Sequence, residues 1–429
     1  MLAGAFLKEQ PETRQPWPAR LPFYYGWIIL PSAALALFVS GPGQTYSVSQ
    51  FVDPLIAEFS WSRTTISGLY TAGSLTAAGA MLGVGWLLDR FGARVMLTGI
   101  GLMMGLAAIW MSLISNQIGL YAGFTALRVF GQGSLTLVPS SLVALWFIRR
   151  RGKATALASL GMVASQAVFP PLIHTLITRI GWRDTWVVLA IIVWVIVIPV
   201  AIVLIRRSPE SVGLRPDGVK ASAAGEQHIA GSEQDYTLRE ALRTRSFWLV
   251  LIASAPQSLL TTALVFHQAA VFDSRGLTSG MSAAVLAVMG PVSLGGTMVG
   301  GFLADRVPNR YLLLAGQAML VVSTLLILVM TELWQAFVYG AVVGFASGGL
   351  ITISAVIWPA YYGRRHLGSI RGAATTSMVA GAALGPLPFA FAFEVLGSYT
   401  SVLTVFLVFP VVSVAAAYFA RPPQQRTQV

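Results

Sequence analysis

The sequence lacks cysteine and contains few charged residues. The absence of cysteine excludes disulfide bonds, thiolate zinc sites and cysteine nucleophiles. Charged residues make up 10% of the 429 positions, against about 25% in a typical soluble domain, whereas hydrophobic residues make up 55%. A water-soluble fold cannot cover its surface with so few charges, so a soluble enzyme, a nucleic-acid-binding protein and a disordered chain are poor interpretations. The composition predicts a polytopic membrane protein.

Long charge-free intervals predict the membrane-spanning segments. They lie at residues 24–52, 64–88, 95–127, 129–148, 154–178, 185–205, 246–272, 276–304, 311–331, 333–363, 372–393 and 395–420. A helix needs about 20 apolar residues to cross a bilayer, and continuous instead of alternating hydrophobicity favours helices over a β-barrel. The interval 95–127 breaks at Ser115-Asn116-Gln117, and its second half continues past Arg128 into 129–148 as one helix. We therefore expect an all-α fold with twelve transmembrane helices.

The basic residues predict the orientation in the membrane. Placing the N-terminus inside puts 23 of the 28 Lys and Arg residues in inner segments, as the positive-inside rule requires. We therefore expect both termini to be cytoplasmic and the protein to lie in the plasma (inner) membrane, where its net charge of +12 meets anionic lipid and not nucleic acid. The expected order is a tail, a six-helix bundle, a linker, a second six-helix bundle and a tail, at residues 1–22, 23–206, 207–245, 246–420 and 421–429.

One loop motif occurs twice in the sequence. The segment GWLLDRFGAR at residues 85–94 recurs as GFLADRVPNR at residues 301–310, at an offset of 216 positions. Such a repeat predicts two pseudo-symmetric six-helix halves related by an axis normal to the membrane. The Asp could hold a cation or a helix N-terminus in a contact that breaks when the inner rim opens, although a plain topology signal is the alternative. The candidate gating residues are Asp89, Arg90, Arg94, Asp305, Arg306 and Arg310.

With this repeated motif the sequence resembles the major facilitator superfamily (MFS) over most of its length. The segments WFIRRRGKA at residues 146–154 and PESVGLRPDG at residues 209–218 are similar to the monocarboxylate-transporter and oxalate/formate-antiporter branches. The resemblance implies the MFS fold and transport by alternating access. Carboxylate carriers of those branches place an Arg in helix 8 and often a Lys in helix 1 or 11, whereas the intervals 276–304 and 372–393 carry no charge here. Their dicarboxylate-binding residues therefore do not transfer to this chain.

Polar residues beside matched prolines indicate a solute site near the membrane midplane. Helix 1 contains Gly41-Pro42-Gly43-Gln44-Thr45-Tyr46, and helix 7 contains Ala255-Pro256-Gln257 at a similar place in the second half. Each proline removes a backbone hydrogen bond, and interrupted helices in corresponding positions mark substrate sites in such carriers. A kink needed only for packing is the alternative. The candidate substrate-binding residues are Arg128, Gln44, Tyr46, Gln257, Gln132 and Tyr70.

Arg128 is the only formal charge near the predicted midplane. A charge inside the membrane is costly and indicates a functional site, and an Arg can hold a carboxylate through two hydrogen bonds. The resemblance offers an alternative, because the superfamily commonly carries a helix 4 Arg that binds helix 1 or influences proton coupling. No Asp or Glu lies at this depth, so His267 is the candidate coupling residue, with a satisfied polar histidine as the alternative.

Together these features predict a secondary transporter that moves a small organic anion, such as a monocarboxylate, by proton symport or anion exchange. Proton-driven efflux of a lipophilic or cationic compound is the alternative, because the helix 8 and helix 11 intervals are uncharged. An intramembrane enzyme is disfavoured, since no paired carboxylates or metal-spaced histidines lie at membrane depth, and no Gly-x-x-x-x-Gly-Lys-Ser/Thr loop supports ATP-driven pumping. We expect no cofactor, no metal site and no obligate protein partner. The expected partners are the solute, protons and membrane lipid.

Overall fold

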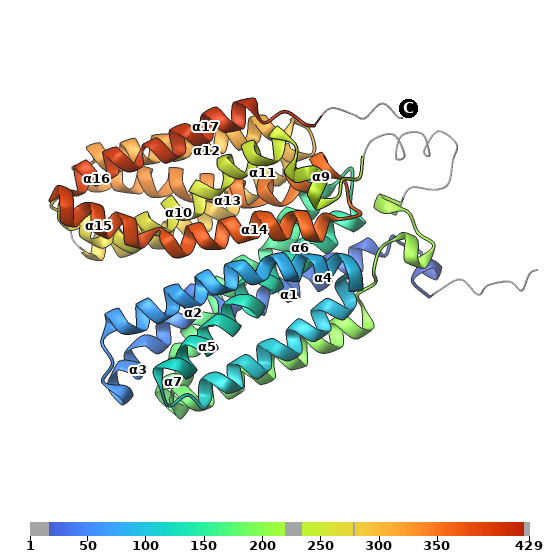
Figure 1. The fold of residues 1–429 in the computed structure, drawn as a ribbon, viewed down its shortest axis with the longest axis horizontal. Coiled ribbons are helices and arrows are strands. Elements are labelled where there is room, and N and C mark those ends of the chain that lie inside the picture. Colours follow the sequence, from blue (N-terminus) through green and yellow to red (C-terminus); the bar gives the residue numbers. More distant parts are fainter. Residues whose placement is uncertain (1–16, 219–233, 278, 424–429) are drawn as a thin grey trace, which may run out of the picture.

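The chain forms two helical bundles that lie side by side (Figure 1). The structure is a computed structural model, and it describes residues 17–218, 234–277 and 279–423. All regular elements within these residues are helices, which confirms the all-α prediction. Parts of the expected tails, 1–22 and 421–429, and of the expected linker, 207–245, lie outside the described residues.

The first bundle contains the helices of the N-terminal half. Their bounds are α1 (Gly26–Phe38), α2 (Thr45–Val48), α3 (Val52–Phe59), α4 (Arg63–Ser112), α5 (Gln117–Leu127), α6 (Leu135–Trp146) and α7 (Arg151–Val203). Gly92 in α4 and Gly181 in α7 adopt positive φ angles of 78° and 82°, which lets each long helix turn back as two rods. The predicted break before helix 4 is confirmed, because the Asn116 side chain caps α5 by accepting a hydrogen bond from the Gly119 amide at 2.7 Å.

The second bundle contains the helices of the C-terminal half. Their bounds are α9 (Leu238–Leu242), α10 (Arg245–Asp273), α11 (Ser279–Ala304), α12 (Asn309–Val329), α13 (Leu333–Tyr362), α14 (Leu367–Leu384), α15 (Pro386–Leu396), α16 (Tyr399–Phe406) and α17 (Val408–Phe419). Nine stretches of the described chain are long and apolar enough to cross a membrane. Two of these stretches, in α4 and α7, turn back on themselves, and α14 with α15 adds a further rod. The described helices are therefore consistent with the predicted twelve.

Each bundle has its own hydrophobic core. Buried apolar side chains form two large clusters, one drawn from residues 25–212 and the other from residues 236–420 with Ala144 added. Trp186 is fully buried in the first cluster and Phe247 is almost fully buried in the second, whereas apolar residues such as Val195 remain exposed on the outside. Exposed apolar side chains of this kind suit a surface that meets lipid. Because each cluster is built almost entirely from its own half of the chain, we expect the two bundles to tilt as units.

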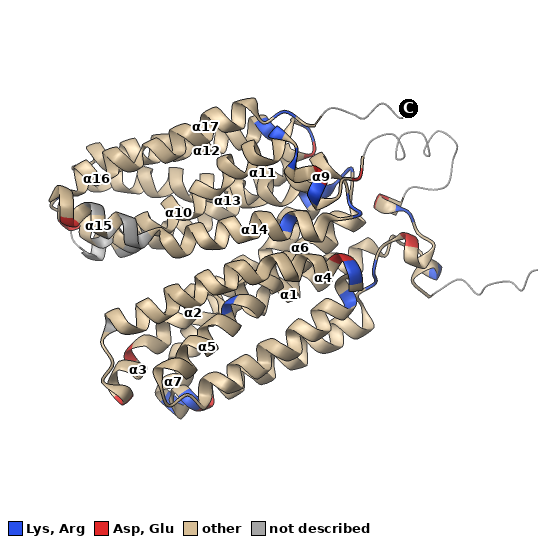
Figure 2. Cartoon of the chain, viewed as in Figure 1, with Lys and Arg blue, Asp and Glu red and all other residues tan. Residues whose placement is uncertain are grey.

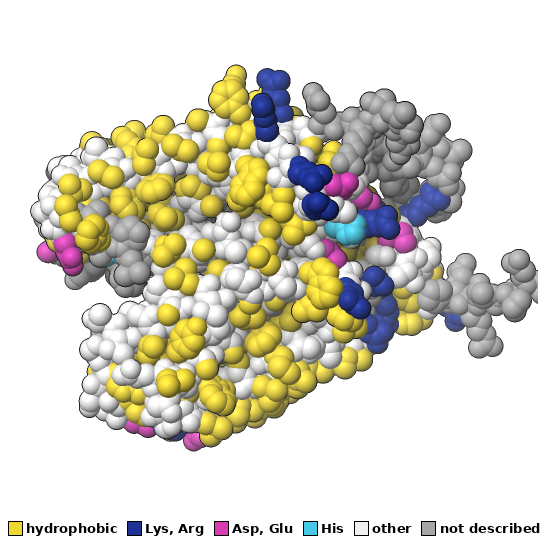
Figure 3. All heavy atoms as spheres, in the orientation of Figure 1, with side chains coloured by type: hydrophobic (Ala, Val, Ile, Leu, Met, Phe, Trp, Pro, Cys, Tyr) yellow, Lys and Arg dark blue, Asp and Glu magenta, His cyan; other side chains and the backbone are white. Residues whose placement is uncertain are grey.

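Most Lys and Arg residues of the described chain lie at one end of the molecule, whereas Asp and Glu also occur at the other end (Figure 2). We call this the basic end and define it by the loops that carry Asp89, Arg149, Arg207, Asp305 and Arg364. Figure 1 shows the two bundles meeting here, through α4 with α14 and α7 with α11. At the opposite end the space-filling view shows the surface hollowed between the two bundles (Figure 3). The structure is therefore closed at the basic end and open at the other.

Glycines bring the backbones of the two bundles together at the basic end. A Cβ atom added to Gly85 on α4 would lie 2.3 Å from the carbonyl oxygen of Gly368 on α14. In the equivalent place, a Cβ added to Gly301 on α11 would lie 2.6 Å from the carbonyl oxygen of Gly152 on α7. The two contacts are related by the 216-residue repeat, since 85 and 301 correspond, as do 152 and 368. Only glycine permits helices to approach this closely.

Substituting alanine for Gly85 should hold the basic end open. The added methyl would overlap the Gly368 carbonyl, and overpacking of this kind costs about 1–3 kcal/mol. We expect a cysteine introduced at Ser141, which is buried between the bundles, to react with a maleimide roughly 10-fold faster in Gly85→Ala. Gly83→Ala is the matched control, because an added Cβ there meets nothing within 4 Å. Equal labelling rates in the two variants would contradict the prediction.

Candidate functional site

Arg128 is buried within the first bundle and bonded only to neutral groups. Its side chain is 3% exposed, and Nη1 donates to Tyr70 Oη on α4 at 2.8 Å and to Thr45 Oγ1 on α2 at 3.2 Å. Tyr70 Oη in turn donates to Thr45 Oγ1 at 2.9 Å, and the guanidinium carbon lies 4.9 Å from the centre of the Tyr70 ring. Among the described residues, Nε of Arg128 has no hydrogen-bond partner and no carboxylate pairs with this cation. A buried positive charge is thus left without a counter-ion.

A wide helical turn and a broken helix position this cation. Arg128 opens η4 (Arg128–Ser134), a π-helical segment between α5 and α6, and such segments often occur at functional sites. Opposite it, helix 1 breaks at η2 (Gly41–Gly43) between α1 and α2. A Cβ on Gly43 would lie 2.6 Å from the Cα of Gly131 in η4, so glycines let the break sit against the wide turn. The interruption predicted in helix 1 is observed, and it places Thr45 beside Arg128.

The matching interruption in helix 7 is absent, and that prediction was wrong. α10 runs unbroken from Arg245 to Asp273 with Pro256 inside it. A proline within a helix removes one hydrogen bond but need not end the helix when its neighbours keep helical angles. Pro42 lies between two glycines, whereas Pro256 lies between Ala255 and Gln257, which favour the helix more strongly. The two prolines are therefore not structurally equivalent.

The other candidate binding residues are distributed around this cluster. Gln44 is buried and its Nε2 donates to Ser40 Oγ at 3.1 Å, so it turns back along helix 1. Tyr46 Oη pairs with Ser165 Oγ on α7 at 2.8 Å. Gln132 in η4 and Gln257 in α10 each have a buried Oε1 without a hydrogen-bond partner among the described residues. Only Tyr70, of the five residues predicted alongside Arg128, forms a hydrogen bond with it in the described structure.

His267 lies in the second bundle, on α10. Its imidazole is half-buried and stacks on the Phe389 ring with a centroid separation of 4.9 Å. The Tyr399 ring lies farther away, at 6.5 Å. The residue lies six positions before the end of α10 at Asp273, near the end opposite to the basic end. It is therefore placed apart from the first-bundle cluster around Arg128.

The two aspartates of the repeated loops cap helices in opposite bundles. Asp89 accepts hydrogen bonds from the amides of Gly368 and Ser369, both at 2.7 Å, and from the Ser369 hydroxyl. Asp305 accepts from the amides of Gly152 at 2.6 Å and Lys153 at 3.1 Å. The partners are the first turns of α14 and α7, where unpaired amides and the helix dipole favour an anion. Of the two expected alternatives, the carboxylates hold helix N-termini.

The pKa of the Asp305 carboxyl responds to opposing influences. Burial at the interface raises its pKa, whereas the hydrogen bonds from the Gly152 and Lys153 amides lower it. The net direction is upward. Opening of the basic end would return this carboxyl to water and remove both influences.

The four arginines of the repeated loops do not pair with these aspartates. The guanidinium carbon of Arg90 lies 5.3 Å from the centre of the Trp86 ring, and that of Arg306 lies 3.9 Å from the centre of the Phe302 ring. Arg310 donates to Tyr311 Oη at 2.6 Å, and the Arg94 side chain is exposed. They therefore cover aromatic surface or face outward at the basic end.

Two further aspartates accept hydrogen bonds from backbone amides in the loops before α7 and α14. Asp217 accepts from the amides of Ile148 at 2.9 Å and Arg149 at 2.8 Å, while Asp235 accepts from those of Arg364 at 2.9 Å and Arg365 at 3.0 Å. Positions 148 and 364 are again separated by 216 residues. Neither aspartate was given a role from the sequence, because neither belongs to the repeated motif, although Asp217 lies in the segment 209–218, which resembles the monocarboxylate-transporter and oxalate/formate-antiporter branches.

The family model of the Major Facilitator Superfamily matches residues 33–309 and 292–429. The chain belongs to this superfamily. It is 24% identical over 285 residues to the oxalate:formate antiporter of Oxalobacter formigenes, across 66% of this chain and 64% of that protein, slightly less than two thirds of its length. It is 25% identical over 387 residues to monocarboxylate transporter 11 of Homo sapiens, across 88% of this chain and 79% of that protein.

The MFS fold is also evident from a solved structure. The crystal structure of the MFS transporter FucP in the outward conformation matches with a TM-score of 0.64 and 15% identity, over 92% of this chain and 98% of that one. With its long apolar helices, the chain is therefore a multi-pass membrane protein with the fold of this superfamily.

A buried arginine between the bundles was not recognised as special from the sequence. Arg371 on α14 is 9% exposed, and its Nη1 donates to Ser141 Oγ on α6 at 3.1 Å. Arg364 also reaches the first bundle of this MFS protein, where Nη1 donates to the Leu145 carbonyl at 2.9 Å. In the sequence both looked like ordinary inner-loop charges, and no spacing signal distinguished them. Both contacts join the two bundles, so they depend on partners that are distant in the sequence.

Proposed function

We propose that this transporter moves a small monocarboxylate-like anion and that Arg128 binds the carboxylate. The observation that supports this proposal is a buried guanidinium whose only described partners are two hydroxyls, at the point where helix 1 is broken. Burying a cation among neutral groups is unfavourable unless an anion completes the site. The relatives named for oxalate, formate and monocarboxylates are consistent with such a cargo.

The bound carboxylate would replace part of the hydroxyl network. Tyr70 and Thr45 already donate and accept around Arg128, so their hydroxyls can turn towards an anion without moving the backbone. A guanidinium can present two parallel N–H groups to a carboxylate, and Nε of Arg128 is free of protein partners among the described residues. The site would therefore recognise a planar, singly charged head group.

We also propose that the basic end faces the cytoplasm and acts as the inner gate. This orientation satisfies the positive-inside rule and makes the described state open to the outside. Opening the inner side would break the hydrogen bonds of Asp89 and Asp305 to α14 and α7. Closing the outer side would bring His267 and the second bundle towards the cluster around Arg128.

Uptake into proteoliposomes tests the cargo and its coupling. We expect radiolabelled monocarboxylates to enter faster under an inward proton gradient, or in exchange for an internal carboxylate. If His267 carries the coupled proton, the His267→Gln carrier keeps exchange but loses its response to the pH gradient. The opposite outcome is a carrier that transports no member of a broad carboxylate panel, while a strain that lacks it is sensitive to drugs. Such a result would favour proton-driven efflux of a lipophilic or cationic compound.

A further inference from the structure

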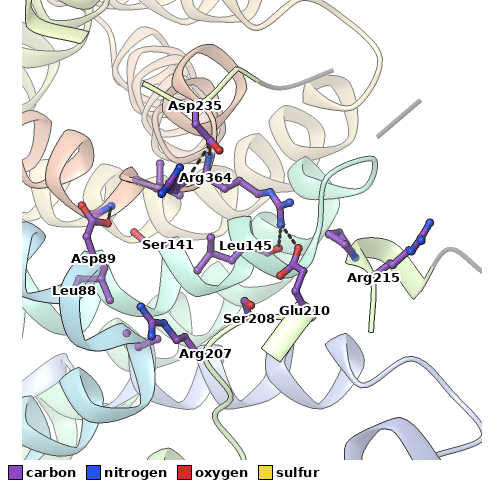
Figure 4. Close-up of a pocket in the computed structure, with 16 residues that line it drawn as sticks. Leu88, Asp89, Ser141, Leu145, Arg207, Ser208, Glu210, Arg215, Asp235 and Arg364 are labelled. Carbon is purple, nitrogen blue, oxygen red and sulfur yellow. Dashed lines mark hydrogen bonds and ion pairs between the residues drawn. The ribbon is translucent and has the colours of Figure 1, made fainter. Parts of the chain in front are cut away.

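We propose that the basic end contains a binding site for a phosphate-bearing anion, bounded by both bundles and by the described ends of the segment 207–245. The site is a cavity of about 810 Å³ (Figure 4). Its wall includes four arginines, namely Arg207, Arg215, Arg364 and Arg365. The cavity shares no lining residue with the cluster around Arg128, so the proposal holds for any transported solute.

The acidic side chains of the cavity wall are already occupied by protein donors. Asp89 accepts hydrogen bonds from the first turn of α14, and Asp235 accepts from the backbone amides of Arg364 and Arg365. Glu210 Oε1 lies 3.2 Å from Nη1 of Arg364, as the dashed line in Figure 4 marks. The carboxylates are thus engaged in local contacts, and four arginines against three carboxylates leave the wall with a formal excess of one positive charge.

Two of the arginines are free to bind such an anion. The exposed side chains of Arg207 and Arg365 form no hydrogen bond or ion pair with the described part of the chain. The Cγ of Arg207 would lie 3.0 Å from a Cβ added to Gly92, so its stem rests on the turn within α4. One arginine follows the first bundle and the other precedes α14 of the second. A group with several phosphate oxygens can offer each guanidinium a pair of acceptor atoms, whereas a monatomic anion offers a single acceptor atom.

Occupancy of this cavity should depend on the state of the transporter. Its wall combines Leu88 and Ser141 of the first bundle with Leu367 and Gly368 of the second. Tilting the bundles apart at the basic end would divide this wall and separate the two arginines. A ligand that binds only the closed form shifts the equilibrium towards that form. The bound anion would therefore hold the inner gate closed.

Thermal unfolding with inorganic pyrophosphate as the probe tests the site. We expect pyrophosphate to raise the melting temperature of the purified full-length carrier in neutral detergent by about 2–4 °C, at ionic strength matched with chloride. The double variant Arg207→Gln/Arg365→Gln should lose this increase. The double variant Arg239→Gln/Arg243→Gln, which removes two charges on and next to α9 outside the cavity, should retain it. No increase in the wild type, or equal increases in all three proteins, would overturn the proposal.

Asp89→Asn distinguishes a site that depends on the closed state from a rigid one. Removing a negative charge from the wall of a rigid cavity would strengthen anion binding. Because the same change loosens the closed basic end, we expect pyrophosphate to raise the melting temperature less in this variant. A larger rise than in the wild type would contradict the dependence on state.

Vesicles of phosphatidylcholine with or without phosphatidylglycerol identify the source of the phosphate. If pyrophosphate no longer raises the melting temperature when phosphatidylglycerol is present, the natural ligand is a lipid head group. If pyrophosphate still raises it in both kinds of vesicle, the natural ligand is a soluble phosphate.

Discussion

Replacing Arg128 by alanine should reduce carboxylate uptake about 100-fold, because the substrate would lose its charged partner in a buried site. The Tyr70–Thr45 hydrogen bond does not involve the guanidinium and can survive the change, so we expect the variant to fold. Arg128→Lys should recover part of the activity, since an ammonium keeps the charge but cannot present two parallel donors. Initial rates of radiolabelled uptake in proteoliposomes measure both effects.

A second arginine provides the control for loss of charge from the first bundle. Arg179 is exposed near the end opposite to the basic end, and Arg179→Ala should transport at the wild-type rate. Unchanged uptake in Arg128→Ala would remove the substrate role and leave the residue as a structural link between η4 and helix 1.

The variant Tyr70→Phe separates the substrate role of Arg128 from a structural one. It removes one of the two described hydrogen bonds of Arg128 and should raise KM only a few-fold if the cation binds the carboxylate directly.

Replacing Asp89 by asparagine should shift the transporter towards the form that is open at the basic end. The carboxylate accepts hydrogen bonds from two amides and one hydroxyl of the other bundle, whereas an amide side chain has one acceptor oxygen and no charge. Hydrogen bonds to a charged group are worth about 1.5–3 kcal/mol, so we expect at least about a 10-fold change in the equilibrium. Asp305→Asn should act in the same direction through Gly152 and Lys153.

The absence of native cysteine makes this change measurable with a single reporter. A cysteine at Ser141, where the native side chain is 2% exposed, should react with a maleimide about 10-fold faster in Asp89→Asn than in the parent. Asp217→Asn is the matched control, because Asp217 caps amides of the loop before α7 without contacting the second bundle in the described hydrogen bonds. Equal acceleration in both variants would show general loosening and not loss of a contact between the bundles.

Hydropathy and charge made the helices and the repeated loops predictable. Each transmembrane segment is a local property, since about 20 apolar residues suffice to specify a span. The repeat placed Gly85 and Asp89 in register with Gly301 and Asp305, and the structure shows that these four residues all lie where the bundles meet. The prediction of a matching break in helix 7 was wrong, because a proline breaks a helix only when the flanking residues and the packing allow it.

The binding cluster could be predicted only in part. Arg128 was identifiable because a lone charge in a long apolar stretch is costly, and Tyr70 was named among several polar aromatics. Thr45, which both of them contact, was not singled out, although it lies between Gln44 and Tyr46. A break in a helix rotates the residues that follow it, so neighbouring positions point in different directions. Which of the three polar side chains would face Arg128 therefore required the structure.

The sequence by itself determined that this protein lies in a membrane, that it consists of two related halves and that most of its basic residues collect at one end. These properties follow from composition and from repetition along the chain. Only the tertiary structure decided what the charges contact. Asp89 meets Gly368 279 positions away, and Asp305 meets Gly152 153 positions away. The way in which the two separately packed bundles meet decides which of these distant residues are in contact. Hydropathy carries no information about that geometry.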